Sequence, residues 1–401
     1  MSTESTRRAF ITGIGLSAGA AALALKEGAM AQQVQIPGFE KAVTDTEAQK
    51  RWKPISDRKI RVGIAGYGVC QFGAAFGFQN HPNVTVAAVT DLFPERCATL
   101  AQLCNCQKTY PSCEEMIKDD SLEALFIATD AVSHARLAIA ALKSGKHVAS
   151  AVPAVFGSLE EAEELYKTVK ATGRKYMMFE TSYFHDDLYA MREMYKAGLL
   201  GKVVYAEGEY FHFSVEQIDS YKGWRIGLPP QWYPTHSNAY YTGVTGLPFT
   251  EVSCMAMPSI VEKFKPANNR YKNPFATEVA LFRTADGGMA RMAVSWDTPG
   301  DSGEKGRIRT QQGTYYGSFA TEGRNIKVPD MTRPPLPPGV EAGGHGGSHG
   351  YLMAEFVEAI LANRKPLVDI SQALTMTAGG IVAHKSALKG GELMKIPQYP
   401  L

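Results

Sequence analysis

The sequence predicts an α/β protein with two parts, a doubly wound parallel sheet followed by an α+β domain with an open, mainly antiparallel sheet. Three observations predict this class. A β-branched run ends in a glycine-rich turn near residue 66, strand and helix patterns then alternate to about residue 180, and the remaining half is rich in long β-type segments. The 401 residues are too many for one ordinary core, so two domains are expected.

The first 31 residues are expected to be an export leader. The pair Arg7 and Arg8 precedes a small-residue apolar stretch over 11–25 and an Ala-Met-Ala site ending at Ala31, the pattern of a twin-arginine leader. A membrane anchor is the alternative, but the stretch is shorter than the roughly 20 residues that span a bilayer. We expect an arm over 32–58, export of the folded protein to the periplasm, and no membrane contact after the leader is removed.

Composition and charge exclude several classes of partner. Lysine and arginine (42) nearly balance aspartate and glutamate (40), so no basic surface for nucleic acid or anionic lipid is expected. Six cysteines occur without Cys-x-x-Cys spacing, and His345 and His349 lie among glycines instead of on a helix, so no metal is expected. A small neutral or weakly charged ligand fits better.

The first predicted strand, residues 59–65, runs into a glycine-rich turn that is typical of dinucleotide binding. Gly66 permits the tight turn, and Gly68 lets the backbone approach a pyrophosphate at the start of the next helix. The third position of the fingerprint is Gln71 here, with Gly73 two residues later. The residues of this turn expected to bind the cofactor are Gly66, Tyr67, Gly68, Val69 and Cys70.

A second apolar strand, residues 84–89, leads to Asp91, about 20 residues beyond the glycines. An acidic side chain there accepts both ribose hydroxyls of the adenosine and repels a 2′-phosphate, which favours NAD over NADP. Arg96 on the next helix keeps NADP open, and both side chains are expected to contact the cofactor. The alternative role for Asp91 is to cap a helix.

The pattern then alternates to the end of the first domain, which is expected to span 59–181. Strands are predicted over 125–128, 147–149 and 175–179, and helices over 133–144 and 159–172. Ligands of such sheets lie at the carboxyl ends of the strands. The residues expected around the nicotinamide half are Thr129, Asp130, His134, Ala151, Pro153 and Glu180.

The second domain is expected to span 182–401. Its predicted strands are 203–213, 277–283, 289–296 and 307–319. A Pro/Gly-rich tract over 329–350 precedes two helices, 351–363 and 371–389, which we expect to pack back on the nucleotide domain. Exposed sheets of this kind often pair between subunits, so a homo-oligomer is expected.

Aromatic and histidine residues gather in three segments of this second half, around residues 183, 224 to 236, and 345. Sugars are bound by aromatic faces and by groups that donate and accept hydrogen bonds, so a carbohydrate substrate is expected. Such clusters also arise as ordinary core. The residues expected to contact substrate are Trp224, Trp232 and His345.

From Lys59 to its end the chain resembles the glucose-fructose oxidoreductase, inositol dehydrogenase and MocA family. The resemblance rests on the start at Gly66 and Gly68, the strand entry Gly-Lys-His-Val at 145–148, Pro153 and His236. It implies a Rossmann domain that binds NAD, followed by an open α/β sheet domain that binds substrate.

Two departures from that family are informative. Val152 replaces the lysine of Glu-Lys-Pro that commonly polarises the reacting hydroxyl, and the Asp-x-x-x-His motif loses its acid and keeps His236. The sequences Val-Pro-Ala, Tyr-Pro-Thr-His and Gly-His-Gly-Gly are similar to the NAD-dependent α-N-acetylgalactosaminidases of the same superfamily. Those enzymes oxidise the 3-hydroxyl of the sugar, remove the neighbouring proton, eliminate the glycoside, and then return water and hydride.

By motif position, this resemblance implies three catalytic roles. His236 would assist oxidation of the hydroxyl, Tyr183 would be the base for the C–H proton, and Tyr233 would hold the substrate. The glutamate that precedes Val-Pro in those hydrolases is Ala151 here, so their substrate preference is not carried over.

Export adds an independent argument, because the periplasm holds no pool of NAD to exchange with. The cofactor would stay bound and be regenerated within each cycle. The first hypothesis is therefore an oxidoreductase that retains NAD and acts on a carbohydrate hydroxyl. A glycoside hydrolase that uses NAD transiently and a non-catalytic sugar-binding protein are the alternatives.

Overall fold

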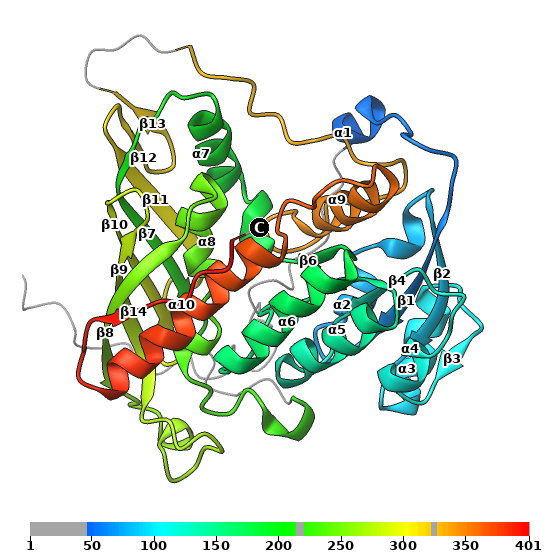
Figure 1. Cartoon of the computed structure of the whole chain (residues 1–401), viewed down its shortest axis with the longest axis horizontal. Helices are drawn as coiled ribbons and strands as arrows, with labels where there is room; N and C mark the ends of the chain where they lie inside the picture. The colour runs from blue at the N-terminus through cyan, green and yellow to red at the C-terminus, as the bar shows by residue number, and fades with distance from the viewer. Residues whose placement is uncertain (1–45, 214–219, 322–326, 401) are drawn as a thin grey trace, which may run out of the picture. The chain divides into compact units, whose positions relative to one another are not determined.

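The computed structural model describes residues 46–213, 220–321 and 327–400. All described residues belong to one compact unit. The leader predicted over 1–31 and residues 32–45 of the predicted arm lie outside the described residues. The chain is described from α1 (Thr46–Arg51) onward (Figure 1).

The first sheet has six parallel strands in the order β3-β2-β1-β4-β5-β6. The strands are β1 (Ile60–Ala65), β2 (Val84–Thr90), β3 (Thr109–Tyr110), β4 (Ala124–Ile127), β5 (His147–Ser150) and β6 (Tyr176–Met178). Their apolar side chains are buried almost throughout, as in sheets covered on both faces. The strand order reverses between β1 and β4, and such a switch point is where open α/β sheets bind ligands.

Helices connect these strands: α2 (Phe72–Ala75), α3 (Pro94–Leu103), α4 (Cys113–Ile117), α5 (His134–Lys143) and α6 (Leu159–Thr172). Local chemistry sets their ends. Ser158 Oγ accepts the N–H of Glu161 at the start of α6, and Gly173 ends that helix in the left-handed region at φ 63°. The helix after the glycine turn, α2, has only four residues.

The second sheet has eight strands in the order β13-β12-β11-β7-β10-β9-β8-β14, and β7 with β10 is its one parallel pair among the described residues. The strands are β7 (Val203–Phe211), β8 (Phe249–Pro258), β9 (Phe275–Thr284), β10 (Met289–Ser295), β11 (Gly303–Thr310), β12 (Thr314–Tyr315), β13 (Phe319–Ala320) and β14 (Met394–Lys395). The predicted class, a parallel sheet followed by an open, mainly antiparallel one, is confirmed.

Some predicted elements of the second domain were wrong. The single strand predicted over 307–319 is three strands, because Thr310 turns the chain by accepting and donating hydrogen bonds with Gly313. Strand β8 and the helices α7 (Asp186–Lys196) and α8 (Thr235–Thr245) were not predicted. Helix α8 is buried on every side over 235–244, so its sequence lacks the one-sided apolar pattern that reveals a surface helix.

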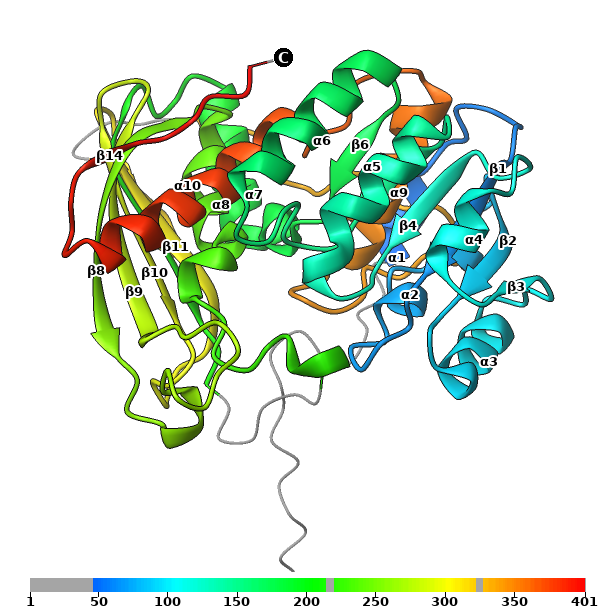
Figure 2. The ribbon, with the colours of Figure 1, turned by 60° about the horizontal axis from the view of Figure 1, so that its bottom comes forward.

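The two C-terminal helices, α9 (His349–Leu361) and α10 (Ile370–Leu388), pack on the nucleotide domain. In α9, the ring of Phe356 packs against those of Phe78 and Phe179. The same two rings also pack against Phe126 of β4. Helix α10, red in Figures 1 and 2, lies between β8 of the second sheet and α6 of the first domain. The two sheets are thereby joined through buried helices.

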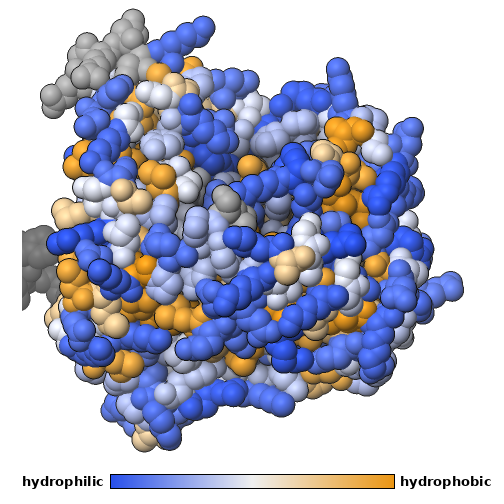
Figure 3. Space-filling view, viewed as in Figure 1, coloured by the Kyte–Doolittle hydropathy of each residue, from blue (hydrophilic) through white to orange (hydrophobic). Residues whose placement is uncertain are grey.

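Hydrophilic side chains cover much of the face seen in Figure 3, with scattered hydrophobic patches between them. Within the described ranges, no helix is long and apolar enough to cross a bilayer.

Candidate functional site

The larger cavity, of about 550 Å³, lies where β1, β2 and β4 end. Its size is within the range of ligand and cofactor sites. Both domains line it. The first-domain residues include Gly66, Tyr67, Gly68, Val69, Cys70, Asp91, Arg96, Thr129 and Asp130, and the second domain contributes Ser220, Tyr221, Lys222, Trp224 and Arg225.

The glycine turn has the geometry that a dinucleotide requires. Gly66 has φ 94°, and a Cβ there would lie 2.4 Å from the carbonyl oxygen of Ala128. A Cβ on Gly73 would lie 2.5 Å from the carbonyl oxygen of Gly66, so Gly73 supplies the close helix-to-strand packing of the third glycine of the fingerprint. Gly68, at φ 62°, lines the cavity, and a Cβ there would approach no atom more closely than the backbone nitrogen of Cys70 at 4.0 Å. The residues therefore fit the cofactor.

Asp91 lies at this turn, as its spacing from the glycines predicted. Its side chain also accepts backbone N–H groups, which the sequence did not predict. Its Oδ2 accepts the N–H groups of Tyr67 at 2.9 Å and Gly68 at 3.1 Å, and its Oδ1 accepts the N–H of Phe93 at 2.9 Å. The carboxylate thus supports the turn and also lines the cavity, where it can accept ribose hydroxyls. Arg96 lines the same cavity, with its guanidinium 4.4 Å from the centre of the Phe93 ring.

A smaller cavity, of about 30 Å³, adjoins the larger one and shares Cys70, Phe72 and Arg225 with it. Its other lining residues are Phe76, Ala151, Val152, Phe179, Thr181, Tyr210, His212, Tyr233, His236 and His345. A volume of this size holds about one or two waters. A larger ligand would therefore extend from it into the adjoining larger cavity.

Arg225 stands at the junction of the two cavities and was not predicted. Its guanidinium lies 4.2 Å from the centre of the Trp224 ring and 5.8 Å from that of Tyr233. Burial opposes its charge, but the neighbouring Cys70, Tyr233 and Tyr210 raise the pKa of Arg225 overall. Trp224 was predicted from the sequence to contact substrate. The position directly after Trp224 was the one signal in the sequence that could have identified Arg225.

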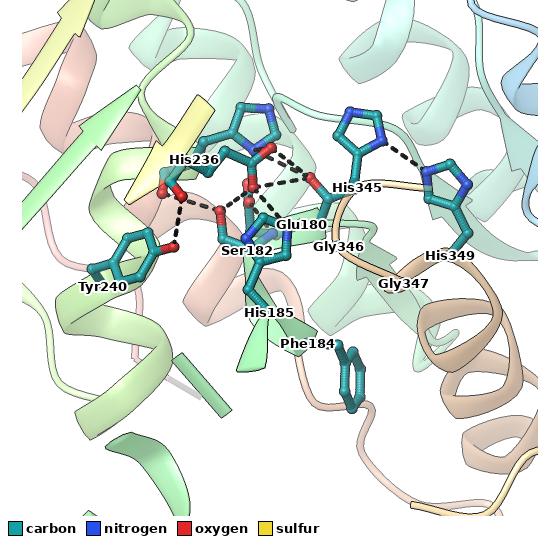
Figure 4. Close-up of polar contacts among 12 residues, drawn as sticks. Glu180, Ser182, Phe184, His185, His236, Tyr240, His345, Gly346, Gly347 and His349 are labelled. Atoms are coloured by element: carbon teal, nitrogen blue, oxygen red, sulfur yellow. Dashed lines mark hydrogen bonds and ion pairs between the residues drawn. The ribbon is translucent and has the colours of Figure 1, made fainter. Parts of the chain in front are cut away.

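His236 is the centre of a buried polar cluster (Figure 4). Its Nδ1 lies 2.8 Å from Oε1 of Glu180 and 3.4 Å from Oε1 of Glu304, the latter on β11. Thr181 Oγ1 lies 3.3 Å from the same nitrogen. Since His236 also lines the smaller cavity, Nε2 is the ring nitrogen left to act there.

The carboxylates decide the charge of His236. Burial lowers the pKa of His236, but Glu180 and Glu304 outweigh burial and raise it to about 9. Burial in turn raises the pKa of both carboxyls, and His236 more than reverses this, so both are lowered overall. The resting cluster therefore contains an imidazolium between two carboxylates at neutral pH.

The glycine loop around His345 is held in place by specific contacts. Arg333 donates to the carbonyl oxygens of Gly346 at 3.2 Å and Gly347 at 3.0 Å. His345 Nδ1 lies 2.9 Å from Nε2 of His349, so these two histidines are partners of one another. Burial and the neighbouring His349 hold the pKa of His345 well below its usual value.

Tyr183 does not lie where the sequence placed it. Its hydroxyl donates to Oε1 of Gln372 at 3.3 Å, and the guanidinium of Arg192 lies 4.0 Å from its ring centre. The side chain is buried and lines neither cavity, so the structure does not support its role as a catalytic base.

Trp232 also lies away from both cavities, because its ring packs against Gly157, where a Cβ would meet it at 2.8 Å, and against Phe156. His134 and Pro153 line neither cavity and contact one another, with Nδ1 of His134 2.9 Å from the Pro153 carbonyl oxygen. Glu180 lines neither cavity and contacts His236 instead of the cofactor. These four residues therefore support the site without lining it.

The sequence predicted no metal, but one group among the described residues has suitable spacing. Ligand atoms of Glu180, His236 and Glu304 all lie within 4.8 Å of one another. The 2.8 Å separation of Glu180 and His236 is that of a charge-assisted hydrogen bond, which a shared proton accounts for.

Comparison with known proteins agrees with this geometry. Residues 60–180 match the model of the oxidoreductase family GFO_IDH_MocA, described as having an NAD-binding Rossmann fold. A glycosyl hydrolase family 109 protein of Solibacter usitatus is 26% identical over 321 residues, covering 71% of this chain and 73% of that protein. A glycosyl hydrolase family 109 protein of Akkermansia muciniphila is 25% identical and covers 100% of this chain and 97% of that protein.

Solved structures share the fold of both domains. The scyllo-inositol dehydrogenase of Lactobacillus casei, solved with bound NAD(H) and scyllo-inositol, has a TM-score of 0.65 at 15% identity and covers 84% of this chain and 99% of that one. An oxidoreductase domain protein of Kribbella flavida has a TM-score of 0.67 at 18% identity and covers 85% of this chain and 100% of that one.

The fold, the glycine turn and the cavity at the switch point define a dinucleotide-binding oxidoreductase with a second domain over its cofactor cavity. Its nucleotide-binding part, residues 60–180, matches the GFO_IDH_MocA oxidoreductase family, whose description is that of an NAD-binding Rossmann fold. The resemblance found in the sequence is confirmed.

Proposed function

We propose that this protein keeps NAD bound and uses it to oxidise or reduce a hydroxyl of a carbohydrate. One observation carries the proposal: the cavity at the glycine turn continues, past Cys70 and Arg225, into the smaller cavity that contains His236. A nucleotide seated on the Gly66 turn would thus have its reactive end beside a buried acid–base group. Relatives named as glycosyl hydrolases and inositol dehydrogenases support a polyhydroxylated substrate.

The roles of the residues follow from their positions. NAD supplies a hydride acceptor and donor when it is bound. His236 would exchange a proton with the reacting oxygen through Nε2, and Tyr233, whose ring centre lies 5.6 Å from that of His236, would form the wall beside the substrate. Arg225 would orient the substrate where the two cavities meet. Ala151 and Val152 are apolar and contribute no acid–base group.

A redox-assisted glycoside hydrolase is the second candidate. The relatives named for glycosyl hydrolase family 109 favour it, as does the Gly-His-Gly-Gly loop, which brings His345 into the smaller cavity. A non-catalytic sugar-binding protein is the third candidate, and the missing lysine at Val152 is the feature that favours it. The position of His236 at a cofactor cavity supports the enzymatic alternatives.

Export by the twin-arginine route to the periplasm remains part of the proposal, together with retention of NAD. The lining of the larger cavity supports retention, because residues of the second domain line it together with the nucleotide turn: Ser220, Tyr221, Lys222, Trp224 and Arg225.

We also propose a homo-oligomer formed through the open sheet. Side chains on β8, β9 and β10 expose large apolar groups to solvent: Met255 (66%), Met257 (56%), Leu281 (56%) and Met289 (59%). A second copy of the sheet would cover them. Sedimentation of the protein, with Leu281→Glu and Met289→Glu variants as a comparison, tests this.

The test of function uses the purified protein with whatever nucleotide it carries. Candidate sugars are added while the absorbance of reduced nicotinamide is recorded. Absorbance that changes and recovers supports redox turnover, and release of the aryl group from aryl glycosides distinguishes hydrolysis from oxidoreduction. Substrate binding without any absorbance change or product would support the non-catalytic alternative.

A further inference from the structure

Two glutamates from different domains converge on one nitrogen of His236. Glu180 follows β6 of the first domain, and Glu304 comes from β11 of the second sheet. Their carboxylate oxygens lie 2.8 Å and 3.4 Å from Nδ1 of His236, as Figure 4 shows for Glu180 and His236. The side chains of Glu180 and Glu304 are 0% and 5% exposed, so water screens neither charge.

Glu304 is itself held as an anion by donors on the segment after Glu180. Ser182 Oγ donates to Oε2 of Glu304 at 2.5 Å, and Thr181 Oγ1 donates to Oε1 at 3.2 Å. His185 Nε2 lies 3.4 Å from Oε2. Hydrogen bonds to a carboxylate favour its charged form. The backbone of Glu304 is fixed as well, because Tyr240 donates to its carbonyl oxygen at 3.1 Å.

The other titratable groups near His236 do not cancel these two charges. Burial lowers the pKa of His212 to about 4 and that of His345 well below its usual value, so both are neutral at pH 7. Tyr210, whose ring centre lies 4.5 Å from that of His236, and Tyr233 have raised pKa values and are also neutral. Arg225 opposes the imidazolium, but less strongly than the two carboxylates favour it.

We propose that Glu304 is a positioning residue that, together with Glu180, keeps His236 in its protonated form, so that His236 acts as a proton donor and the resting site is set for carbonyl reduction. This inference rests on the proposed function. Neither glutamate touches the cavity that holds His236; each acts through its contact with Nδ1.

In the reducing half-reaction, the carbonyl carbon would gain a hydride, with both its electrons, from a reduced dinucleotide held at the Gly66 turn. The carbonyl π electrons move to oxygen, which takes the proton of His236 Nε2, so an alcohol and a neutral imidazole result. The carbonyl is reduced and the dinucleotide is oxidised. Alcohol oxidation is the reverse and needs neutral His236, which is scarce at pH 7.

The direct test is a histidine-selective NMR titration of the nucleotide-containing protein, with His236→Gln used to assign the resonance. We expect His236 to be protonated at pH 7. Glu304→Gln keeps the shape and the acceptor for Ser182 but removes the charge, and we expect it to lower the titration midpoint by about one pH unit or more. The control is Glu251→Gln, since Glu251 on β8 pairs with the exposed Arg283 and should leave the midpoint unchanged.

A neutral His236 at pH 7, or an unchanged midpoint in Glu304→Gln, would overturn the proposal. Where Glu304→Gln fails to fold by circular dichroism, Glu304→Asp replaces it, because the shorter side chain keeps the charge but moves it away from Nδ1 of His236; a smaller shift in the same direction is expected. Elemental analysis is the second measurement. If the protein carries one metal ion per chain, and a chelator removes it and alters the His236 resonance, then the glutamates bind metal. That result would overturn the proposal.

Single-turnover rates then test the consequence. Oxidation of the alcohol should rise up to tenfold per pH unit between pH 6 and 8, while carbonyl reduction stays flat, and Glu304→Gln should move the rise to lower pH. Equal pH profiles for the two directions would contradict the proposal. Absence of any nicotinamide turnover, with the NMR result as expected, would instead refute the proposed function and leave the charge of His236 established.

Discussion

Substituting Gly66 by alanine tests the close approach of the nucleotide turn to β4. Two costs add at this position. The φ of 94° lies where L side chains rarely occur, which costs about 1–3 kcal/mol. The new Cβ would also lie 2.4 Å from the carbonyl oxygen of Ala128, and this overlap with backbone requires a further shift costing about 1–3 kcal/mol.

The matched control is Gly77→Ala. Gly77 has a similar φ of 79°, but nothing lies within 4 Å of the Cβ it would gain. It should therefore show only the same conformational cost, about 1–3 kcal/mol. Urea unfolding of the two variants measures the difference, and calorimetric titration measures their affinity for NAD.

We expect Gly66→Ala to lose about 4 kcal/mol of stability and at least tenfold in NAD affinity, since the turn must move away from β4. We expect Gly77→Ala to bind NAD normally, because Gly77 lies outside the cavity. Equal stability and equal NAD affinity in the two variants would refute the argument that the turn is pressed against β4.

Three further predictions follow from the site. Tyr183→Phe should cost about 1 kcal/mol in urea unfolding, through loss of the bond to Gln372, and leave turnover within about twofold; a hundredfold loss would restore its role as a base. Asp91→Ala should lower NAD affinity in binding titrations, because it leaves the amides of Tyr67 and Gly68 without their acceptor. It should also reduce the ratio of NAD affinity to NADP affinity, because it removes the charge that repels a 2′-phosphate. Unchanged binding of both nucleotides would contradict this. The pKa of His236 is raised in the folded protein, so its contribution to stability is full below about pH 6.5 and is lost as pH rises to about 9. Parent protein should thus lose unfolding free energy over this range, and His236→Gln should lose less; parallel curves would contradict the assignment.

Most of the first domain could be predicted because its signals are local, although β3 and α4 were not predicted. Buried β-branched runs, the glycines at 66 and 68, and the helix predicted over 159–172 each follow from a few neighbouring residues. Asp91 was found by its spacing from the glycine turn. The role of Gly73 was not foreseen, because only the structure shows which backbone oxygen its missing Cβ would meet.

The polar cluster could be predicted only in part. His236 was found through its motif, but its partner Glu304 lies 68 residues further along the chain on β11, a strand whose start the sequence did not indicate. Sheet pairing creates that contact, and no local pattern records it. Tyr183 was misplaced for a related reason: motif position gives the neighbourhood of a side chain, but the packing of Arg192 and Gln372 decides its direction.

The most direct measurement is an experimental structure of the protein with NAD bound. The account predicts the pyrophosphate at Gly68, the adenosine ribose at Asp91, and the nicotinamide ring at the junction formed by Cys70, Phe72 and Arg225, facing His236. A dinucleotide bound elsewhere, or a nicotinamide ring directed away from His236, would contradict it.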